Sequence, residues 1–331
     1  MQSTKSSETH APVGPSYDPN ETGQAPADAL RTAAPGGVGA APGGVGAAPA
    51  GEGFTPTRTL AEQGALPDKA EPWTKIRLDL PHCQLTPAQL REIAEFIESQ
   101  SASLRDLSLD LSGCSGLESL LGLEEVFRSL GSAAALEVLV IYMRSPAYTD
   151  NDETLAALGQ SLTELDALGA FALDIAGHNF SDVGVATFFY QVSRVPNLRQ
   201  MWLSFARGKR LSAQSFEHIE HLVAASETLK KLSLDFSHMQ AIDDEASAYF
   251  GPIAGRIAKA LEEFNVNISG TACTNDGLEN ILRGTRASPV ERLSIHAFDV
   301  ARIDHHARAI VNGFSSFRMK ASLYTRPEDF T

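Results

Sequence analysis

The sequence predicts a curved α/β solenoid, with a parallel sheet on one face and helices on the other. First, a pattern of apolar residues, mostly leucine, recurs from Trp73 almost to the last residue. Second, neighbouring copies begin about 30 residues apart, which is a period typical of solenoid repeats. Third, residues that favour helix starts return at the same phase of each copy. One copy cannot bury its own apolar face, so consecutive copies are predicted to stack around a shared core.

Each copy begins with an apolar residue and two variable residues, and then alternates apolar and variable positions. Alternation at period two predicts a strand that is buried on one face. Because a helical stretch follows each strand, the strands are predicted to run parallel. Weaker copies begin at Trp73, Val290 and Phe314, which with the clear copies gives about nine repeats. The clear copies are Leu104–Leu111, Leu136–Met143, Leu168–Ile175, Leu198–Phe205, Leu229–Phe236 and Leu261–Ile268.

The helical segments between the strands have their own start signals. Thr86 is placed to cap a helix, with Pro87 at the first helical position and Gln89 where a capping box requires it. Apolar residues then recur on one face of that helix, from Leu90 to Ile97. Later helices are predicted to begin near Asp152, Ser181, Ser212 and Asn275.

With these motifs, the chain resembles the leucine-rich repeat family, and within it the ribonuclease-inhibitor-like branch with longer repeats of about 31 residues. The family places Asn or Cys after the strand, and Cys83 and Cys114 stand at that position. The segments 178–184 and 274–278 look like the family's turn into the helix. The resemblance covers roughly residues 72 to 325 and implies a fold made for binding.

Three copies depart from the family pattern in the turn that follows the strand. Ser145-Pro146, Gly208-Lys209 and Met239-Gln240 occupy the Asn or Cys region of the third, fifth and sixth copies. Irregular turns are therefore expected at these three places.

Residues 1–70 differ in composition from the rest and are expected to be a disordered tail or linker, followed by the repeat domain at 71–331. The tail holds a near-duplicate Ala-Pro-Gly-Gly-Val-Gly-Ala at 34–40 and 41–47 and almost no large apolar residue, so it cannot bury enough apolar surface to offset its ordering entropy. No apolar run of signal-peptide length lies near Met1, and none approaches the roughly 18 residues of a membrane span.

Cysteine usage and charge restrict the compartment and the partner. The cysteines Cys83, Cys114 and Cys273 are odd in number and far apart, which favours reduced thiols in a cytoplasmic or other reducing compartment. The net charge is −14, and residues 1–70 hold four Lys and Arg against seven Asp and Glu, which leaves −11 on the solenoid. Nucleic acid is therefore an unfavourable partner, and a basic protein surface is a better candidate.

Variable strand positions are expected to face the concave surface, where a partner would bind. The position before the last apolar residue of each copy is acidic in the first copies, and its last members are His296 and Lys320. Asp79 and Asp110 are expected to be neighbours, and their repulsion, about 1 kcal/mol in water, suggests a site for a cationic partner unless Arg77 and Arg105 offset it. Tyr142 and Trp202 are aromatic anchors of the kind enriched in interfaces. The predicted partner-binding residues are Asp79, Asp110, Tyr142, Asp174, Trp202, Asp235, Asn267 and His296.

No group of residues supports a catalytic, metal or cofactor site, so the chain is not expected to be an enzyme. Adjacent His305 and His306 on a predicted helix point about 100° apart, which disfavours a shared metal ion. The favoured function is recognition of a protein partner on the concave sheet. One alternative is a structural subunit of a large assembly, which Phe188, Phe189 and Tyr190 would favour if they were exposed on a helix. A GTPase-activating role rests on the fold alone, and fold alone does not define function.

Overall fold

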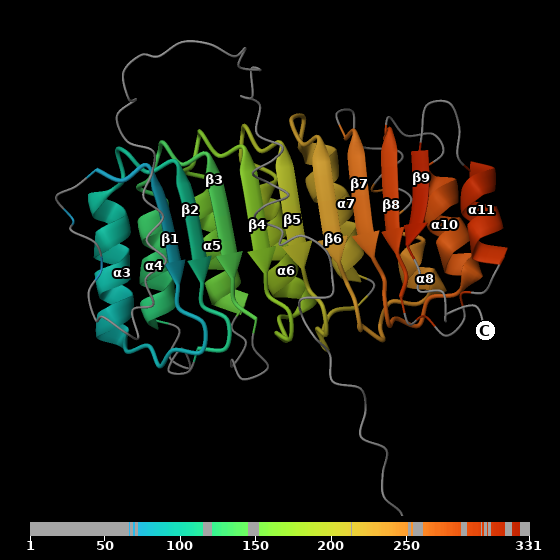
Figure 1. The fold of residues 1–331 in the computed structure, drawn as a ribbon, viewed down its shortest axis with the longest axis horizontal. Helices are drawn as coiled ribbons and strands as arrows, with labels where there is room; N and C mark the ends of the chain where they lie inside the picture. Colours follow the sequence, from blue (N-terminus) through green and yellow to red (C-terminus); the bar gives the residue numbers. More distant parts are fainter. Residues whose placement is uncertain are drawn as a thin grey trace, which may run out of the picture.

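In the described part of the computed structural model, nine parallel strands form one sheet in sequence order, β1 to β9. In Figure 1 the strands lie side by side across the molecule, and the helices lie behind them on one face of the sheet. This is the architecture of a leucine-rich-repeat-like solenoid, as the recurring pattern predicts. The structure describes residues 66, 69, 72–114, 121–144, 152–212, 214–250, 253, 261–285, 290–298, 300, 303, 306–314 and 320–324.

Strands and helices alternate throughout the described part of the chain. The strands are β1 (Lys75–Asp79), β2 (Asp106–Asp110), β3 (Val138–Tyr142), β4 (Ala170–Asp174), β5 (Gln200–Ser204), β6 (Lys231–Asp235), β7 (Glu263–Asn267), β8 (Arg292–His296) and β9 (Lys320–Tyr324). The helices are α3 (Pro87–Ser99), α4 (Leu121–Leu130), α5 (Asp152–Leu162), α6 (Asp182–Val192), α7 (Gln214–Ala225), α8 (Asp244–Ser247), α10 (Asn275–Thr285) and α11 (His306–Phe314).

The strand frame, meaning the position of each strand relative to the leading apolar residue of its copy, is confirmed in the first eight copies and wrong in the ninth. In the first eight, the strand begins two residues after the leading apolar position, as at Lys75 after Trp73. In the ninth copy the predicted leading residue, Phe314, is the last residue of α11, and Tyr324 pairs with His296. The ninth frame is therefore displaced by four residues, and Lys320 lies at the start of β9 beside Arg292.

The turns after the strands are more regular than predicted. Gly113, Gly177 and Gly270 have positive φ angles of 67°, 84° and 64°, and Arg207 and His238 adopt the same conformation at 63° and 60°. The backbone N–H groups of Arg207 and His238 also donate to the next repeat, as that of Gly113 does. The irregular turns expected in the fifth and sixth copies are thus absent, although a side chain costs about 1 kcal/mol in this conformation. Ser145-Pro146 lies outside the described residues.

The core is continuous between the sheet and the helices, and phenylalanines run through its centre. Phe188 and Phe189 on α6 are 5.7 Å apart between ring centroids. Phe189 lies 6.0 Å from Phe205, which stacks on Phe236 of the next repeat at 5.8 Å. Such tilted and stacked pairs add about 0.5–1.5 kcal/mol each beyond area burial. Of the three successive aromatics on α6, only Tyr190 is exposed.

Helix starts are fixed by carboxylates that reach across from the preceding repeat. Asp182, the first residue of α6, accepts from the backbone N–H of Ser212 at 2.8 Å and from its hydroxyl at 2.6 Å. Asp152 is bound in the same way by Ser181, which caps α6, and Asp244 is bound by Thr274 before α10. These bonds join residues about 30 positions apart, so they stack neighbouring repeats as well as capping helices.

Asp182 gives a prediction for acid stability. Burial raises its pKa, but the hydrogen bonds from Ser212 and Ser215 outweigh burial and hold the pKa below its ordinary value. The carboxylate therefore stabilises the fold above the ordinary Asp pKa of about 3.9, and this stability is lost as pH falls through the lower folded-state pKa. We expect Asp182→Asn to lower the melting temperature near neutral pH, and we expect this deficit to shrink as the pH falls through the folded-state pKa of Asp182. The control is Asp276→Asn, an exposed first-turn residue of α10, and an equally large loss there would contradict the prediction.

Residues before the first strand already belong to the folded domain. Leu66 packs against the core, the Lys69 ammonium lies 2.9 Å from Glu95, and the Lys69 carbonyl accepts from the Gln100 amide. Leu66 and Lys69, which belong to the predicted tail, thus contact the repeat domain, and residues 1–65 lie outside the described part of the chain. No described helix is both long enough and apolar enough to cross a bilayer.

Candidate protein-interaction surface

The face of the sheet opposite the helices, here called the open face, corresponds to the predicted concave surface. Because side chains alternate across a strand, positions one, three and five of each strand lie on it. The middle row consists of Arg77, Ser108, Val140, Ala172, Trp202, Ser233, Asn265, Ser294 and Ser322. The end row consists of Asp79, Asp110, Tyr142, Asp174, Ser204, Asp235, Asn267, His296 and Tyr324. All eight predicted partner-binding residues lie on these two rows.

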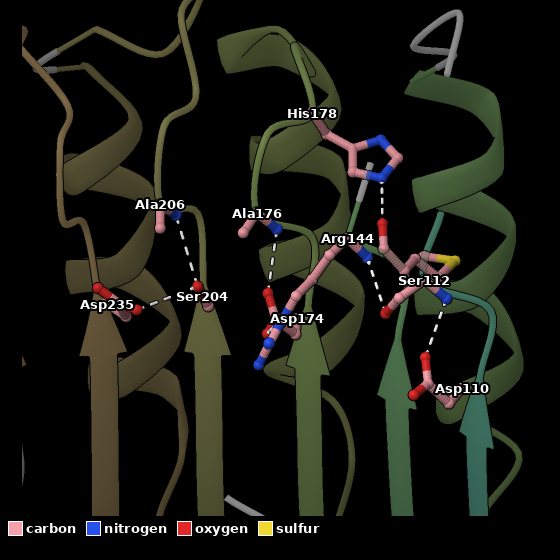
Figure 2. Close-up of polar contacts among 10 residues, drawn as sticks. Asp110, Ser112, Arg144, Asp174, Ala176, His178, Ser204, Ala206 and Asp235 are labelled. Carbon is pink, nitrogen blue, oxygen red and sulfur yellow. Dashed lines mark hydrogen bonds and ion pairs between the residues drawn. The ribbon is translucent and has the colours of Figure 1, made fainter. Parts of the chain in front are cut away.

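Several end-row side chains close the turn that follows their own strand. Asp110 Oδ1 accepts from the Ser112 backbone N–H at 2.9 Å, and Asp174 Oδ1 accepts from that of Ala176 at 3.1 Å (Figure 2). Asp235 and Asn267 accept from the residues two positions later at 2.9 and 3.0 Å. Asp and Asn favour this local turn because their short side chains mimic a backbone carbonyl. The polar end row therefore has a structural role whatever partner binds beside it.

Asp174 is the most deeply buried predicted site residue, at 2% exposed. Its carboxylate pairs with the guanidinium of Arg144 (Figure 2). Arg144 lies just after the end of β3, which is the neighbour of β4 in the sheet. Burial raises the pKa of Asp174, while Arg144 opposes that rise. Arg144 also lies over the Tyr142 ring, 5.7 Å from its centroid. A partner approaching this part of the sheet therefore meets Arg144 and Tyr142 before Asp174.

Charges at the N-terminal end of the open face are largely paired. Asp79 and Asp110 are direct neighbours in the register, as predicted. Arg77 donates to Asp79 at 2.8 Å, and this hydrogen bond raises the Arg77 pKa. Arg105, the second expected counter-charge, pairs with Glu137 instead. The predicted repulsion is thus offset mainly by Arg77.

The C-terminal end carries aromatic and mixed-charge groups. His296 and Tyr324 are stacked with ring centroids 4.5 Å apart, and burial lowers the His296 pKa, which favours the neutral imidazole. Glu263 lies between Arg292 at 2.8 Å and Lys231 at 3.7 Å. The basic end of the end row that was expected at Lys320 is therefore wrong, because Tyr324 occupies that position.

The centre of the open face is apolar. Val140, Ala170 and Ala172 form a cluster separate from the main core, and Val138, Tyr142 and Trp202 pack against it while remaining partly exposed. Val140 and Ala172 are fully buried although the helices lie on the other side of the sheet. Two aromatic side chains beside an apolar floor have the composition of a protein-interaction hot spot.

The residues that the structure describes contain no group of three or more His, Cys, Asp or Glu placed to hold a metal ion. Asp304 and His305 lie outside them, and His306 is the first residue of α11. Cys83, Cys114 and Cys273 are free thiols, and burial raises the pKa of Cys114 to about 11 and that of Cys273 to about 12, so both buried thiols are protonated and unreactive.

Comparisons with known proteins concern the fold only. No protein-family model matches the chain, and no curated protein matches it. One similar solved structure is a chain of the Rad7 and Elc1 complex from yeast, with 15% identity and a TM-score of 0.48, covering 77% of this chain and 57% of that chain. Another is the leucine-rich repeat-containing protein LegL7 from Legionella pneumophila, with 12% identity and a TM-score of 0.45, covering 82% of this chain and 89% of that chain. This chain thus spans a little over half of the first neighbour.

Proposed function

We propose that this chain is a non-enzymatic binding module of the leucine-rich-repeat type that holds a protein partner on the open face of its sheet. The observation that carries the proposal is the pair of partly exposed aromatics, Tyr142 and Trp202, which pack against an apolar floor. Aromatic side chains provide large contact areas with few rotatable bonds, so they dominate the affinity of many interfaces. The remaining predicted site residues would surround this centre as a polar rim.

A partner with a basic surface fits the overall charge. The solenoid carries −11 of the net charge, but the ion pairs Lys75–Asp106 and Arg77–Asp79 reduce the negative charge on the open face itself. Acidic residues on an exposed surface increase the rate of association with a basic partner more than they increase the affinity. The aromatic centre would therefore determine how long the complex lasts, and the acidic surface how fast it forms.

A second candidate function uses the convex side of the molecule. Val183 and Tyr190, both on α6, are 72% and 64% exposed and are the most exposed large apolar residues described. The Arg194 guanidinium lies 6.0 Å from the centroid of the Tyr190 ring. An exposed apolar group on a helix is expected where a subunit contacts others in a large assembly.

Affinity capture from the native lysate with the full chain distinguishes the two functions. We expect Tyr142→Ala/Trp202→Ala to lower recovery of one basic protein by about tenfold or more. The matched control, Val183→Ala/Tyr190→Ala, removes similar apolar groups from α6 and is expected to recover that protein unchanged. If the α6 variant loses its partners and the open-face variant keeps them, the chain acts through its convex face.

A further inference from the structure

One acidic residue of the open face, Asp174, is neutralised by an arginine that follows the preceding strand. Arg144 lies two positions after Tyr142, which ends β3, and its guanidinium pairs with the Asp174 carboxylate on β4. The same guanidinium lies 5.7 Å from the centroid of the Tyr142 ring. Beside Arg144, Asp174 is only 2% exposed. The open face thus already holds one guanidinium between an aromatic ring and a carboxylate.

Two strands further along the sheet, the same arrangement lacks its arginine. Asp235 ends β6 as Asp174 ends β4, and both accept from the backbone N–H two positions later. On the preceding strand, Ser204 ends β5, and Ala206 stands two positions after it, where Arg144 stands after β3. Figure 2 shows Ser204 and Ala206 between Asp235 and Asp174. The residue equivalent to Arg144 therefore cannot neutralise Asp235.

Asp235 has hydrogen bonds but no strongly cationic partner. Its carboxylate accepts from the Ser237 backbone N–H at 2.9 Å and from the Ser204 hydroxyl at 3.3 Å. Among the residues that the structure describes, no lysine or arginine forms an ion pair with it. Burial raises the pKa of Asp235, and the hydrogen bonds and the nearby His238 oppose that rise only in part. Because its side chain is partly exposed, a cation from outside the chain can reach it.

An aromatic ring also lies near this carboxylate. Trp202 is two positions before Ser204 on β5, and its direct neighbour on β6 is Ser233. Strands are about 4.8 Å apart and rise about 3.3 Å per residue, so the Cα atoms of Trp202 and Asp235 are about 8 Å apart. In the described part of the chain no guanidinium or ammonium lies over the Trp202 ring, which is partly exposed. One cation above Ser204 can therefore bind both groups, since cation–π attraction extends to about 6 Å from a ring centroid.

We infer that the protein partner places an arginine side chain above Ser204, where its guanidinium contacts the Trp202 ring and pairs with Asp235. That the arginine belongs to a protein partner rests on the proposed function, whereas the site itself rests on the geometry of β5 and β6. Arginine fits better than lysine, because a planar guanidinium can stack on a ring while it donates two hydrogen bonds to a carboxylate. A guanidinium is also less strongly hydrated than an ammonium, so it enters a partly buried site at a lower cost.

Fluorine NMR of the full chain labelled with fluorotryptophan tests the site without the partner. The chain has two tryptophans, so Trp202 reports on the site and Trp73, which precedes β1, is the internal reference. The probe is N-acetylarginine amide. We expect a saturable shift of the Trp202 signal with a dissociation constant of about 10 mM, as one cation–π contact and one charged hydrogen bond would give. The Trp73 signal should stay in place, and N-acetyllysine amide should bind about threefold more weakly or less.

Asp235→Asn tests the role of the carboxylate. Asn267 makes the same turn with Ser269 in the next repeat, so asparagine can keep the turn while it removes the charge. This variant should weaken binding of the arginine probe by about fivefold or more, because a neutral acceptor replaces a charged one. The matched control is Asp79→Asn at the same position of β1, which removes an equal charge. Five strand steps, about 24 Å, separate it from Asp235, so salt screens its effect and binding should stay within about twofold of wild type.

A Trp202 signal that does not move, or that moves equally in the wild type and in Asp235→Asn, would overturn the inference whatever the partner does. In affinity capture, Asp235→Asn should lower recovery of the same protein that Tyr142→Ala/Trp202→Ala loses. If only the double variant loses that protein, the partner does not use the site, so the inference fails while the proposed function stands. If recovery depends on none of the three residues, the proposed function fails, while probe binding that depends on Asp235 still supports an arginine site on the sheet.

Discussion

Gly277→Ala is expected to lower the free energy of unfolding by about 3 kcal/mol or more. A Cβ atom at this position would lie 2.8 Å from Ser247 Oγ and closer still to Asp244 Oδ1 and Cys273 Sγ. Overpacking of this kind costs about 1–3 kcal/mol. It would also displace the Asp244 carboxylate, which accepts from the Gly277 N–H at 2.9 Å, and a hydrogen bond to a charged group contributes about 1.5–3 kcal/mol.

The matched control for this prediction is Gly313→Ala on α11. A Cβ atom there would meet nothing within 4 Å, and alanine favours a helix over glycine by up to about 1 kcal/mol. Urea denaturation should therefore show opposite signs for the two variants. If Gly277→Ala stabilised the fold as Gly313→Ala does, helix propensity would dominate at both positions, and the close contact with the Asp244 carboxylate would be contradicted.

Gly277 also illustrates what the sequence could not predict. The segment Thr274-Asn275-Asp276-Gly277 predicted a turn into a helix, and α10 begins there. The glycine is required by Asp244, which lies 33 positions earlier and reaches it only when the repeats stack. A Cβ atom at Gly184, at the start of α6, would likewise lie too close to the Asp152 carboxylate of the preceding repeat. Local propensity predicts the helix start, whereas the contact depends on the superhelical geometry of the stacked repeats.

The strand frame could be predicted wherever leucine-like residues occupied its apolar positions. The capping box of Thr86 and Gln89 was also predicted and is present in α3. The ninth strand was misplaced because a displacement of four residues preserves period-two alternation. Ala321 fits both frames, and only pairing with β8 selects the frame in which it lies opposite Leu293.

For the candidate site, the sequence correctly predicted on which face of the sheet the residues lie, but it did not predict the structural role that several of them have. Alternation correctly placed Asp110, Asp235 and Asn267 on one face of the sheet. A serine two residues after each of them was a visible signal for a side-chain turn, and the structure shows that turn. Nothing in the sequence indicated the role of Arg144, because this residue follows the strand of the third copy and lies outside the alternating pattern. Its contact with Asp174 depends on which strands are neighbours.

Arg144→Ala is expected to cause the second large loss of stability, about 3 kcal/mol at neutral pH. Removing one partner of a buried ion pair leaves an uncompensated charge, which costs about 3–5 kcal/mol when both groups are buried. The lower value applies because Arg144 is partly exposed. The matched control is Arg105→Ala, since Arg105 and Glu137 also join adjacent repeats but are both more than half exposed, and such pairs contribute about 0.2–1 kcal/mol.

The pH dependence of the Arg144→Ala variant tests the cause of this loss. Burial already raises the Asp174 pKa, and without Arg144 nothing comparable opposes the rise. A carboxyl whose folded-state pKa lies above its unfolded value stabilises the fold as pH falls through the folded-state pKa. The deficit of the variant should therefore shrink as the pH falls below neutral, and Arg144→Ala/Asp174→Asn should recover much of the stability at neutral pH. A deficit that is independent of pH and is not rescued by Asp174→Asn would show that Arg144 stabilises the sheet by packing on Tyr142 and not by its charge.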